Sequence, residues 1–286
     1  MTALGFLHRP DGAKTPHGPG APIAVRQAGP GDAPAILLLH GWLQSSAVFQ
    51  KQLAGPLATR WRLIAPDFSG HGATPLMGDA ATIADGTVWA RDIADVIGAL
   101  GLRRPVLVGW SMGGWAIGDY LARHGAGALG GIVTIGSLAR VGAPADPAMM
   151  AKRKADVRAE GMFDPDPAVQ IEAAITFARA MTAAPLSKRD LAFLVAQMMA
   201  CTPAVRRAAR LRDADWRPAF AAAAALPSLV IQGGAERVCL APMAEETRAA
   251  LAAEMLTIPG AGHMPFWEQS AIVDAVIDRL AEAVHP

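Results

Sequence analysis

The sequence predicts an α/β fold in which a mostly parallel, doubly wound sheet carries an inserted helical cap. Short apolar runs alternate with amphipathic helical patterns over most of the 286 residues, as in right-handed βαβ units. Several runs are apolar without interruption, which is typical of strands that helices cover on both faces. The alternation stops near residue 141 and resumes after residue 218. We therefore expect a core formed by residues 1–140 and 219–286 and a cap formed by residues 141–218.

The elements of the core are recognised in chain order by their apolar pattern. The first twenty residues are rich in proline and glycine and predict a loose arm or a short edge strand. Apolar runs then predict strands at 34–39, 61–65, 105–109, 131–135, 227–232 and 254–258. Apolar residues spaced three and four apart predict helices at 45–57, 87–100, 112–124, 242–253 and 268–284.

The expected cap differs from the core because it shows no strand pattern. Its helical pieces are interrupted by Pro165, Pro167, Pro185 and Pro203. Its charge is concentrated in the arginines at positions 206, 207, 210 and 212. We interpret this cluster as a solvated helix face rather than as a site for an acidic partner.

Composition excludes several classes of function. The chain has 26 basic and 25 acidic residues, and this balance predicts neither a nucleic-acid nor a membrane partner. Cys201 and Cys239 lie far apart, so no metal site or disulfide framework is expected. No apolar run has the length of a signal peptide or a membrane span. We expect a cytoplasmic protein with a small-molecule substrate, and the sequence leaves homo-oligomerisation open.

The segment Gly109-Trp110-Ser111-Met112-Gly113 matches the pattern G-x-S-x-G between a predicted strand and a predicted helix. The glycines permit a turn so sharp that side chains there would collide with neighbouring backbone. Such a turn presents the serine hydroxyl at the carboxyl edge of the sheet, where α/β sheets bind ligands. We therefore predict Ser111 as a nucleophile. A chance match is the alternative, and the flanking strand and helix argue against it.

The loop after the first predicted buried strand, His40-Gly41-Trp42-Leu43, is the expected oxyanion loop. Acyl transfer needs hydrogen-bond donors where the substrate oxygen becomes negative. We assign these donors to the backbone N–H groups of Met112 and Trp42. A simple turn with Trp42 as core filler is the alternative. His40 is expected to anchor this loop.

A base and an acid are expected in two glycine-rich loops that follow the last two strands. His263 lies in the loop after the last strand, from which an imidazole can take the proton of Ser111 and return it to a leaving alcohol. Glu236 follows a glycine turn at the end of the preceding strand and is the expected acid. An exposed carboxylate paired with Arg237 is the alternative for Glu236, and Asp146 is the alternative acid.

Large side chains next to these residues in the chain suggest an apolar acyl pocket. Trp42, Trp110, Met112, Met264 and Phe266 flank the predicted catalytic loops. We predict that they line a substrate pocket. Residues of these types are also common in cores, which is the alternative for each of them.

With these motifs assembled, the sequence resembles the α/β-hydrolase superfamily over nearly its whole length. It is most similar to the branch of small esterases and cofactor-free haloperoxidases or perhydrolases. The positions that carry the resemblance are 40–42, 67–72, 109–114, 233–238 and 260–265. The resemblance implies an α/β-hydrolase fold without a cofactor and a serine hydrolase that cleaves small carboxylic esters through an acyl-enzyme. It also implies Ser111 as nucleophile, His263 as base, and the amides of Trp42 and Met112 as oxyanion donors.

The sequence departs from that branch at two positions. The acid is usually aspartate, whereas Glu236 stands here. Perhydrolase-like members often carry proline after the aromatic residue of the oxyanion loop, whereas Leu43 stands here and favours ester hydrolysis. Epoxide hydrolases and haloalkane dehalogenases use an aspartate nucleophile, so Ser111 argues against both.

Other functions remain open on the same residues. Perhydrolysis or haloperoxidase chemistry and carbon–carbon bond cleavage can use the same three side chains. The motifs His-Gly-Trp and Gly-Trp-Ser are also similar to the carboxylesterases that cleave the methyl ester of pimeloyl carrier protein, and an arginine-bearing cap would suit that acidic partner. A non-catalytic ligand receptor is disfavoured by the intact nucleophile, base and acid.

Overall fold

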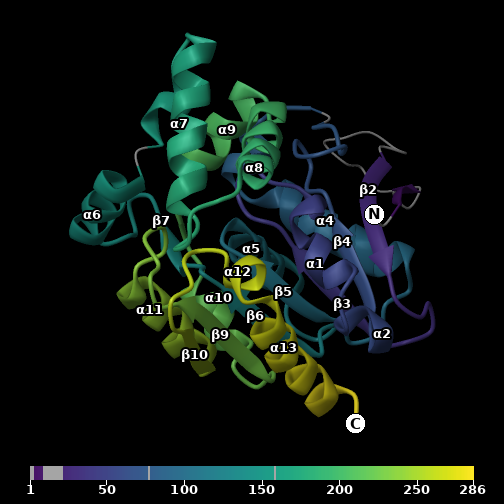
Figure 1. Ribbon diagram of the computed structural model, residues 1–286. Coiled ribbons are helices and arrows are strands. Elements are labelled where there is room, and N and C mark those ends of the chain that lie inside the picture. Colours follow the sequence, from purple (N-terminus) through teal and green to yellow (C-terminus); the bar gives the residue numbers. More distant parts are fainter. Residues whose placement is uncertain (1–2, 9–21, 77, 158) are drawn as a thin grey trace.

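A computed structural model describes residues 3–8, 22–76, 78–157 and 159–286, and an eight-stranded sheet forms its centre (Figure 1). The strands lie in the order β1-β2-β4-β3-β5-β6-β9-β10. The pairs β1–β2 and β2–β4 are antiparallel, and all other neighbours in this sheet are parallel. The sheet therefore confirms the predicted α/β fold with a mostly parallel, doubly wound arrangement.

The strands of the sheet are short, and the central ones are fully buried. Their bounds are β1 (Leu4–His8), β2 (Pro22–Ala28), β3 (Ala35–Leu39), β4 (Arg62–Pro66), β5 (Val106–Trp110), β6 (Gly131–Ile135), β9 (Ser228–Gly233) and β10 (Glu254–Ile258). Every residue of β3, β5 and β6 is buried, because helices cover both faces of the sheet there.

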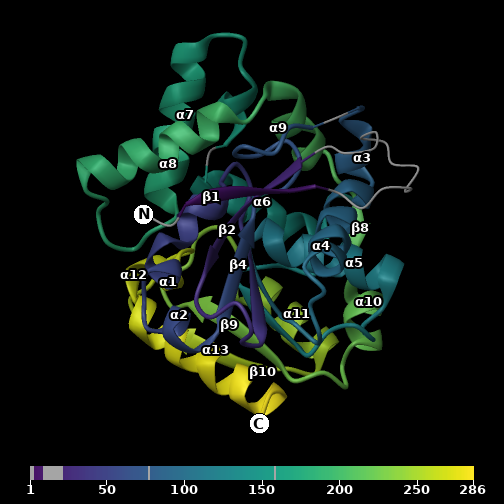
Figure 2. The same ribbon diagram turned by 90° about the vertical axis from the view of Figure 1, so that its right-hand side faces the viewer.

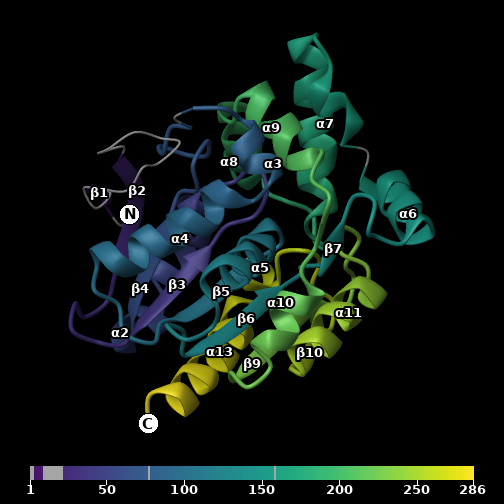
Figure 3. The same ribbon diagram turned by 180° about the vertical axis from the view of Figure 1, so that it is seen from behind.

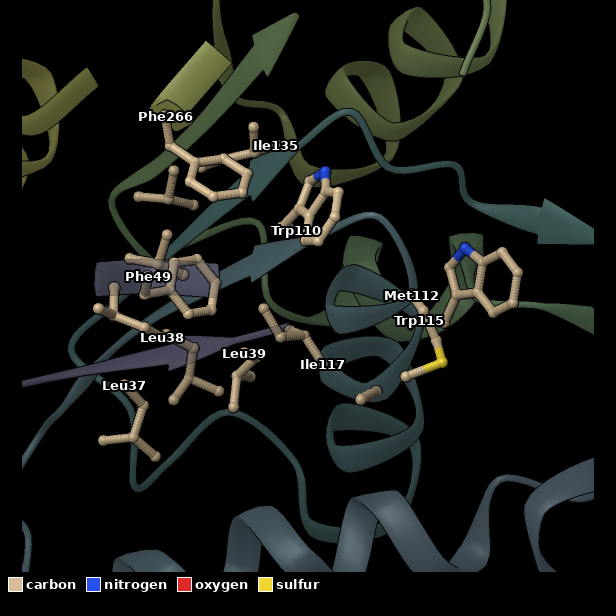
Figure 4. Close-up of a cluster of buried hydrophobic side chains, with 14 of the residues drawn as sticks. Leu37, Leu38, Leu39, Phe49, Trp110, Met112, Trp115, Ile117, Ile135 and Phe266 are labelled. Carbon is tan, nitrogen blue, oxygen red and sulfur yellow. The ribbon is translucent and has the colours of Figure 1, made fainter. Parts of the chain in front are cut away.

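Helices lie on both faces of the sheet. One group includes α4 (Thr87–Ala99), α5 (Met112–His124) and α10 (Arg217–Ala222), which are seen in front in Figure 3. The C-terminal helix α13 (Ser270–Val284) lies on the other face, beside the short helices α1 (Gln50–Leu53) and α2 (Leu57–Arg60). The remaining core helices are α3 (Ala81–Ala84), α11 (Ala241–Leu251) and α12 (Pro265–Glu268). A cluster of large apolar side chains from β3, β5 and α5 fills the space between them (Figure 4).

Some expected elements differ in extent. The helix expected over 45–57 is split into a 3-10 turn, η1 (Ser46–Phe49), and helices α1 and α2. Gly55 and Pro56 separate the two helices, because proline has no N–H to donate within a helix. The short edge strand expected near the N-terminus is β1, at the sheet edge that faces the viewer in Figure 2. The rest of that arm, residues 9–21, lies outside the described residues. The strand β2 and the helices α3 and α10 were not expected.

The segment expected as a cap is helical, and most of it lies at the top of the molecule in Figure 1, with its first helix at the left. It comprises α6 (Pro147–Val157), the 3-10 turn η2 (Glu160–Phe163), α7 (Pro167–Ala180), α8 (Lys188–Ala200) and α9 (Pro203–Arg210). The expectation of no strand in this segment is wrong at its two ends, where the chain enters and leaves through an antiparallel pair of two-residue strands, β7 (Arg140–Val141) and β8 (Ala214–Asp215). The assignment of these residues to a separate domain remains a prediction.

The parallel strands end together at one edge of the sheet. In the register of the sheet, Leu39 of β3 lies opposite Gly109 of β5, and Trp110 lies opposite Ile135 of β6. Ile135 in turn lies opposite Ile231 of β9. The loops that follow these strands therefore open at the same edge, which is where open α/β sheets bind their ligands. Within the described ranges, no helix is long and apolar enough to cross a membrane.

Candidate active site

Ser111 occupies a strained turn between β5 and α5. Its backbone has φ 51° and ψ −115°, which L residues rarely adopt. The turn is fixed on both sides: the N–H of Ser111 donates to the carbonyl of Ile135 (2.8 Å), and its own carbonyl accepts from the hydroxyl of Ser137 (2.8 Å). The surrounding structure therefore determines this conformation and holds the serine at the end of the strand.

The glycines around Ser111 are required by the close approach of the strand and the helix. A Cβ atom on Gly109 would lie 2.6 Å from the carbonyl carbon of Gly113, and one on Gly113 would collide with the carbonyl of Leu39. These contacts agree with the reason expected from the sequence for glycine at both positions.

The loop after β3 lies beside this turn, and two backbone N–H groups are available there. Met112 is the first residue of α5, so its N–H has no acceptor within the helix. The N–H of Trp42 takes no part in the turn and loop hydrogen bonds found among the described residues. Leu43, the next residue, has φ 62°, a value that the ring of proline forbids.

His40 fixes the loop after β3 through two hydrogen bonds. Its Nδ1–H donates to the carbonyl of Gly41 (2.9 Å), and its Nε2 accepts from the N–H of Phe68 (3.0 Å). Burial lowers the pKa of His40 to about 4, so the ring is neutral and serves as donor and acceptor at once. Asp67 stabilises the neighbouring turns, because its carboxylate accepts from the N–H groups of Ser46 (2.7 Å) and Ala73 (2.8 Å).

The structure brings His263 and Glu236 together. Oε2 of Glu236 lies 2.7 Å from Nδ1 of His263, and each side chain is only 2% exposed. Oε1 of Glu236 accepts from the N–H of Val238 (2.6 Å). A carboxylate can only accept hydrogen bonds, so Nδ1 of His263 carries the proton and Nε2 is left with a free lone pair.

The pair lies next to the backbone around Ser111. A Cβ atom on Gly136, the residue after Ile135, would lie 2.9 Å from Nδ1 of His263 and 3.0 Å from Oε2 of Glu236. The indole N–H of Trp110 donates to the carbonyl of His263 (2.8 Å). Trp110, which precedes Ser111, and Gly136, which follows the neighbouring strand β6, therefore both lie against the loop of His263. Gly136 was not predicted from the sequence, although its position at the end of a central strand would have indicated it.

Asp146, the alternative acid, has a different role. Its Oδ1 accepts from the N–H groups of Ala148 (2.8 Å) and Met149 (3.2 Å) at the start of α6. These are the contacts of a helix cap. In the described structure Asp146 has no contact with His263, so the acid beside the imidazole is Glu236.

Ser111 opens into a pocket between the sheet edge and the expected cap. The cavity volume is about 40 Å³. Trp42, Trp115 and Val238 line it from the core. The cap side is lined by Val141, Gly142, Met150, Ala159, Glu160, Phe177, Ala209, Arg210 and Arg212. The indole of Trp42 packs edge-on against Phe177, with ring centroids 5.7 Å apart.

Four of the five residues expected in the pocket do not line it. Trp110, Met264 and Phe266 are buried, and Trp110 packs against the ring of Phe266 with centroids 5.1 Å apart (Figure 4). Neighbouring residues of a strand point to opposite faces, so Trp110 enters the core behind the histidine loop although it precedes Ser111 in the chain. Met112 is also buried, and of the five expected side chains Trp42 lines this pocket.

The expectation that the cap arginines form a solvated face is wrong for two of them. Arg206 is 3% exposed, and its guanidinium donates to the carbonyl of Cys201 (2.7 Å) and to Oε1 of Gln170 (2.8 Å). Arg212 is 2% exposed and pairs with Asp119 of α5, with Nη2 and Oδ1 2.7 Å apart. The spacing of charged residues along a helix does not show whether residues of another element will bury them and form hydrogen bonds with them. The sequence pattern was therefore misleading for these two arginines.

The residues described by the structure contain no group of three or more histidine, cysteine, aspartate or glutamate side chains suited to a metal ion. The chemistry that the site supports from its own residues is acyl transfer: a strained serine, a histidine with a free lone pair, a buried carboxylate, and two backbone donors.

Comparison with known proteins agrees with this fold. A model of the alpha/beta hydrolase family matches residues 36–276, and the chain belongs to this family of enzymes. It is 39% identical over 108 residues to a non-heme haloperoxidase from Rhodococcus erythropolis, covering 38% of each chain. It is 36% identical over 105 residues to a bifunctional esterase/perhydrolase from Acinetobacter calcoaceticus, covering 37% of each. These matches span less than two fifths of both relatives.

A similarity to a solved structure extends over the whole chain. An esterase from Rhodococcus sp. ECU1013 superposes with a TM-score of 0.82 at 28% identity, covering 97% of this chain and 98% of the esterase. The relatives thus include esterases and haloperoxidase-like proteins, as the resemblance in the sequence suggested.

Proposed function

We propose that the protein is a serine hydrolase that cleaves small carboxylic esters through an acyl-enzyme. The observation that carries this proposal is the buried pair of His263 and Glu236 beside the strained turn of Ser111, with Ser111 facing a small pocket. The esterases among the relatives support the same assignment.

In the proposed first step, Oγ of Ser111 attacks the ester carbonyl and its proton passes to Nε2 of His263. The carbonyl oxygen becomes negative and accepts from the N–H groups of Trp42 and Met112. His263 then gives its proton to the alkoxide, so the alcohol leaves and the acyl group stays on Ser111. Water then adds to the acyl carbon and gives a proton to His263. His263 returns this proton to Oγ of Ser111 as the bond between Oγ and the acyl carbon breaks, which releases the acid and the free serine.

One contact must form for this mechanism. Among the described residues no hydrogen bond joins Oγ of Ser111 to the ring of His263. Rotation about a single side-chain bond of Ser111 moves its hydroxyl without any change in the fold, and catalytic hydrogen bonds often tighten only with substrate bound. Before substrate binds, the hydrogen bond to Glu236 keeps the imidazole oriented, with the lone pair on Nε2.

The test is hydrolysis of p-nitrophenyl acetate and butyrate by the wild type and Ser111→Ala. We expect Ser111→Ala to lose at least about 10⁴-fold in kcat while keeping its circular dichroism and Tm. Ser228→Ala, at the opposite end of the sheet, is the control and should keep full activity. A fluorophosphonate should label the wild type at Ser111 and leave Ser111→Ala unlabelled. Full activity or labelling in Ser111→Ala would refute the nucleophile.

Perhydrolysis is the second candidate, because one relative is named a haloperoxidase and another an esterase/perhydrolase. Here hydrogen peroxide would replace water as the nucleophile that releases the acyl group from Ser111. The backbone of Leu43 favours hydrolysis, since φ 62° excludes the proline that perhydrolase-like members often carry there. Peracid formation from acetate and hydrogen peroxide, measured beside ester turnover, decides between the two.

A further inference from the structure

Three of the side chains that line the pocket at Ser111 carry buried N–H donors that lack acceptors. Within the part of the chain that the structure describes, the indole N–H groups of Trp42 and Trp115 make no hydrogen bond. Nε and Nη1 of Arg212 are also without a partner. All three side chains line the same pocket. Buried donors without acceptors are rare in folded proteins because each has lost its hydrogen bonds to water, so a set of them in one pocket points to a ligand.

The guanidinium of Arg212 is held rigidly in this position. Nη2 donates to both carboxylate oxygens of Asp119, at 2.7 and 2.8 Å. The planar group lies between two indoles, 5.3 Å from the ring centroid of Trp89 and 5.2 Å from that of Trp216. Trp216 also donates to Asp119 (2.8 Å). Three elements therefore fix the guanidinium, and the donors it leaves free have a defined direction.

Trp115 extends this arrangement toward the nucleophile. Its indole stacks on Trp216 at a centroid distance of 5.9 Å, and it lies on α5 one helical turn after Ser111. The stack of Trp115, Trp216 and Arg212 thus connects the nucleophile helix with the cap segment. Side chains that carry unpaired N–H donors therefore line the same pocket as Ser111.

The charges of the pocket indicate which acceptor fits. Asp119 neutralises Arg212, and the two other ionisable side chains of the lining, Glu160 and Arg210, have opposite charges. An anion bound there would add a charge to a balanced site. A neutral carbonyl oxygen would instead satisfy the free donors without any further counter-ion.

We propose, building on the ester hydrolysis proposed above, that Arg212 and Trp115 bind a second carbonyl oxygen of the substrate. The preferred substrates are then small esters whose acyl chain carries an oxo group, rather than plain alkyl esters or monoesters of dicarboxylic acids. Arg212 and Trp115 are specificity-determining residues in this assignment. A purely structural role of Arg212, as the link between the cap segment and α5, predicts no such preference.

The test compares esters of equal chain length. Methyl pentanoate, hexanoate and heptanoate are measured against methyl 4-oxopentanoate, 5-oxohexanoate and 6-oxoheptanoate, with monomethyl glutarate, adipate and pimelate as the anionic series. We expect kcat/KM of the wild type to be about tenfold or more higher for at least one oxo ester than for its alkyl counterpart. The anionic series should be poorer than the oxo series.

Variants test which residues cause the preference for oxo esters. Arg212→Lys keeps a positive charge next to Asp119 but removes Nε and Nη1, and Trp115→Phe removes one N–H. Each variant should lower the ratio of kcat/KM for the oxo ester to kcat/KM for the alkyl ester toward one. Because both values are measured on the same preparation, this ratio does not depend on how much of the variant is folded. Arg206→Lys changes another buried cap arginine, which does not line the pocket, and should keep the ratio of the wild type. If Arg212→Lys does not fold, Trp115→Phe decides.

Binding separates this inference from the proposed function. Calorimetry with Ser111→Ala should show tighter binding of methyl 5-oxohexanoate, or of whichever oxo ester is preferred, than of its alkyl counterpart. If no ester is hydrolysed but this selective binding persists and depends on Arg212, the hydrolase proposal fails and the pocket assignment stands. Hydrolysis without an oxo preference, a preference for the anionic series, or a ratio unchanged in both variants would overturn the pocket assignment.

Discussion

Oε2 of Glu236 lies 2.7 Å from Nδ1 of His263, and the same carboxylate accepts from the backbone N–H of Val238 through Oε1. Each of its two oxygens thus has one donor. The arrangement needs a group that accepts on both sides, which an ionised carboxylate does and an amide does not. The tautomer of His263 therefore depends on the charge of Glu236 as well as on its position.

Glu236→Gln should remove most activity for this reason. The glutamine must turn its NH₂ group toward either Val238 or His263, and facing His263 it favours the tautomer whose Nε2 carries the proton. That tautomer cannot take a proton from Ser111. We expect kcat for p-nitrophenyl esters to fall by about 10³–10⁴-fold, with little change in Tm.

Glu236→Asp tests reach rather than charge. Its carboxylate is shorter by one methylene, so we expect a smaller loss, on the order of 10²-fold, from displacement of the imidazole. Glu254→Gln, at the exposed start of β10, is the control. Equal activity in Glu236→Gln and the wild type would show that another group orients His263.

Gly136→Ala should damage catalysis through direct contact. The added methyl group would lie 2.9 Å from Nδ1 of His263 and 3.0 Å from Oε2 of Glu236, and the residue has φ 52°. We expect about 10²-fold lower kcat together with about 1–2 kcal/mol lower stability. Gly101→Ala is a matched control, because Gly101 has φ 59° and open space around its Cβ position. It should lose stability and keep its kcat; if both variants keep kcat, the contact at Gly136 has no catalytic consequence.

Glu268→Gln should loosen the loop of His263. One carboxylate oxygen accepts from the N–H of Gly262 (2.6 Å), and the other accepts from Ala183 (2.7 Å) and Ala184 (3.1 Å) after α7. A glutamine would turn its NH₂ group toward one of these donors. We expect roughly 10–10²-fold lower kcat in ester hydrolysis and a loss of about 1–3 kcal/mol in the free energy of unfolding. The exposed Glu282→Gln is the comparison, and an unchanged kcat in Glu268→Gln would show that this link does not position His263.

Acid should destabilise the fold through two buried histidines. Burial lowers the pKa of His40 from 6.5 to about 4, and burial with the neighbouring charge of His40 lowers the pKa of His71 from 6.5 to about 3. The unfolded chain therefore binds more protons than the folded one below pH 6.5, so the stabilising contribution is complete above pH 6.5 and is lost as the pH falls toward 4. Each histidine contributes a slope of up to about 1.4 kcal/mol per pH unit.

Urea unfolding at pH 7, 6 and 5 measures this slope. His71→Phe replaces the imidazole with a ring that does not titrate, next to Trp89 and His40. We expect a shallower dependence of the free energy of unfolding on pH in this variant, whereas the exposed His8→Gln should keep the slope of the wild type. The same slope in His71→Phe would mean that His71 does not titrate differently on folding.

Local sequence was sufficient for the strand–turn–helix around Ser111. The turn needs glycine at 109 and 113 because backbone atoms of neighbouring elements approach there, and this requirement is visible as two glycines four residues apart. The apolar runs were sufficient for the parallel strands, because strands buried on both faces must be apolar throughout. The position of a residue after such a strand also placed Glu236 and His263 at one edge of the sheet.

The pocket required the tertiary structure. Trp110 and Phe266 are adjacent to the expected catalytic segments in the chain but face the core, whereas Phe177 and Arg212 are distant in sequence and line the pocket. Periodic patterns report which residues avoid water, and they carry no information about which buried residues from different elements meet. The burial of Arg212 illustrates this limit, since its charge became compatible with the interior only through Asp119, 93 residues earlier in the chain.

The amino-acid sequence by itself determined the class of fold and the turn that presents Ser111, because both depend on interactions between residues close in the chain. The tertiary structure alone decided that Glu236 rather than Asp146 meets His263, and which side chains surround the substrate. Those choices depend on the packing of the cap segment and of α5 against the sheet edge, which long-range burial and hydrogen bonding determine.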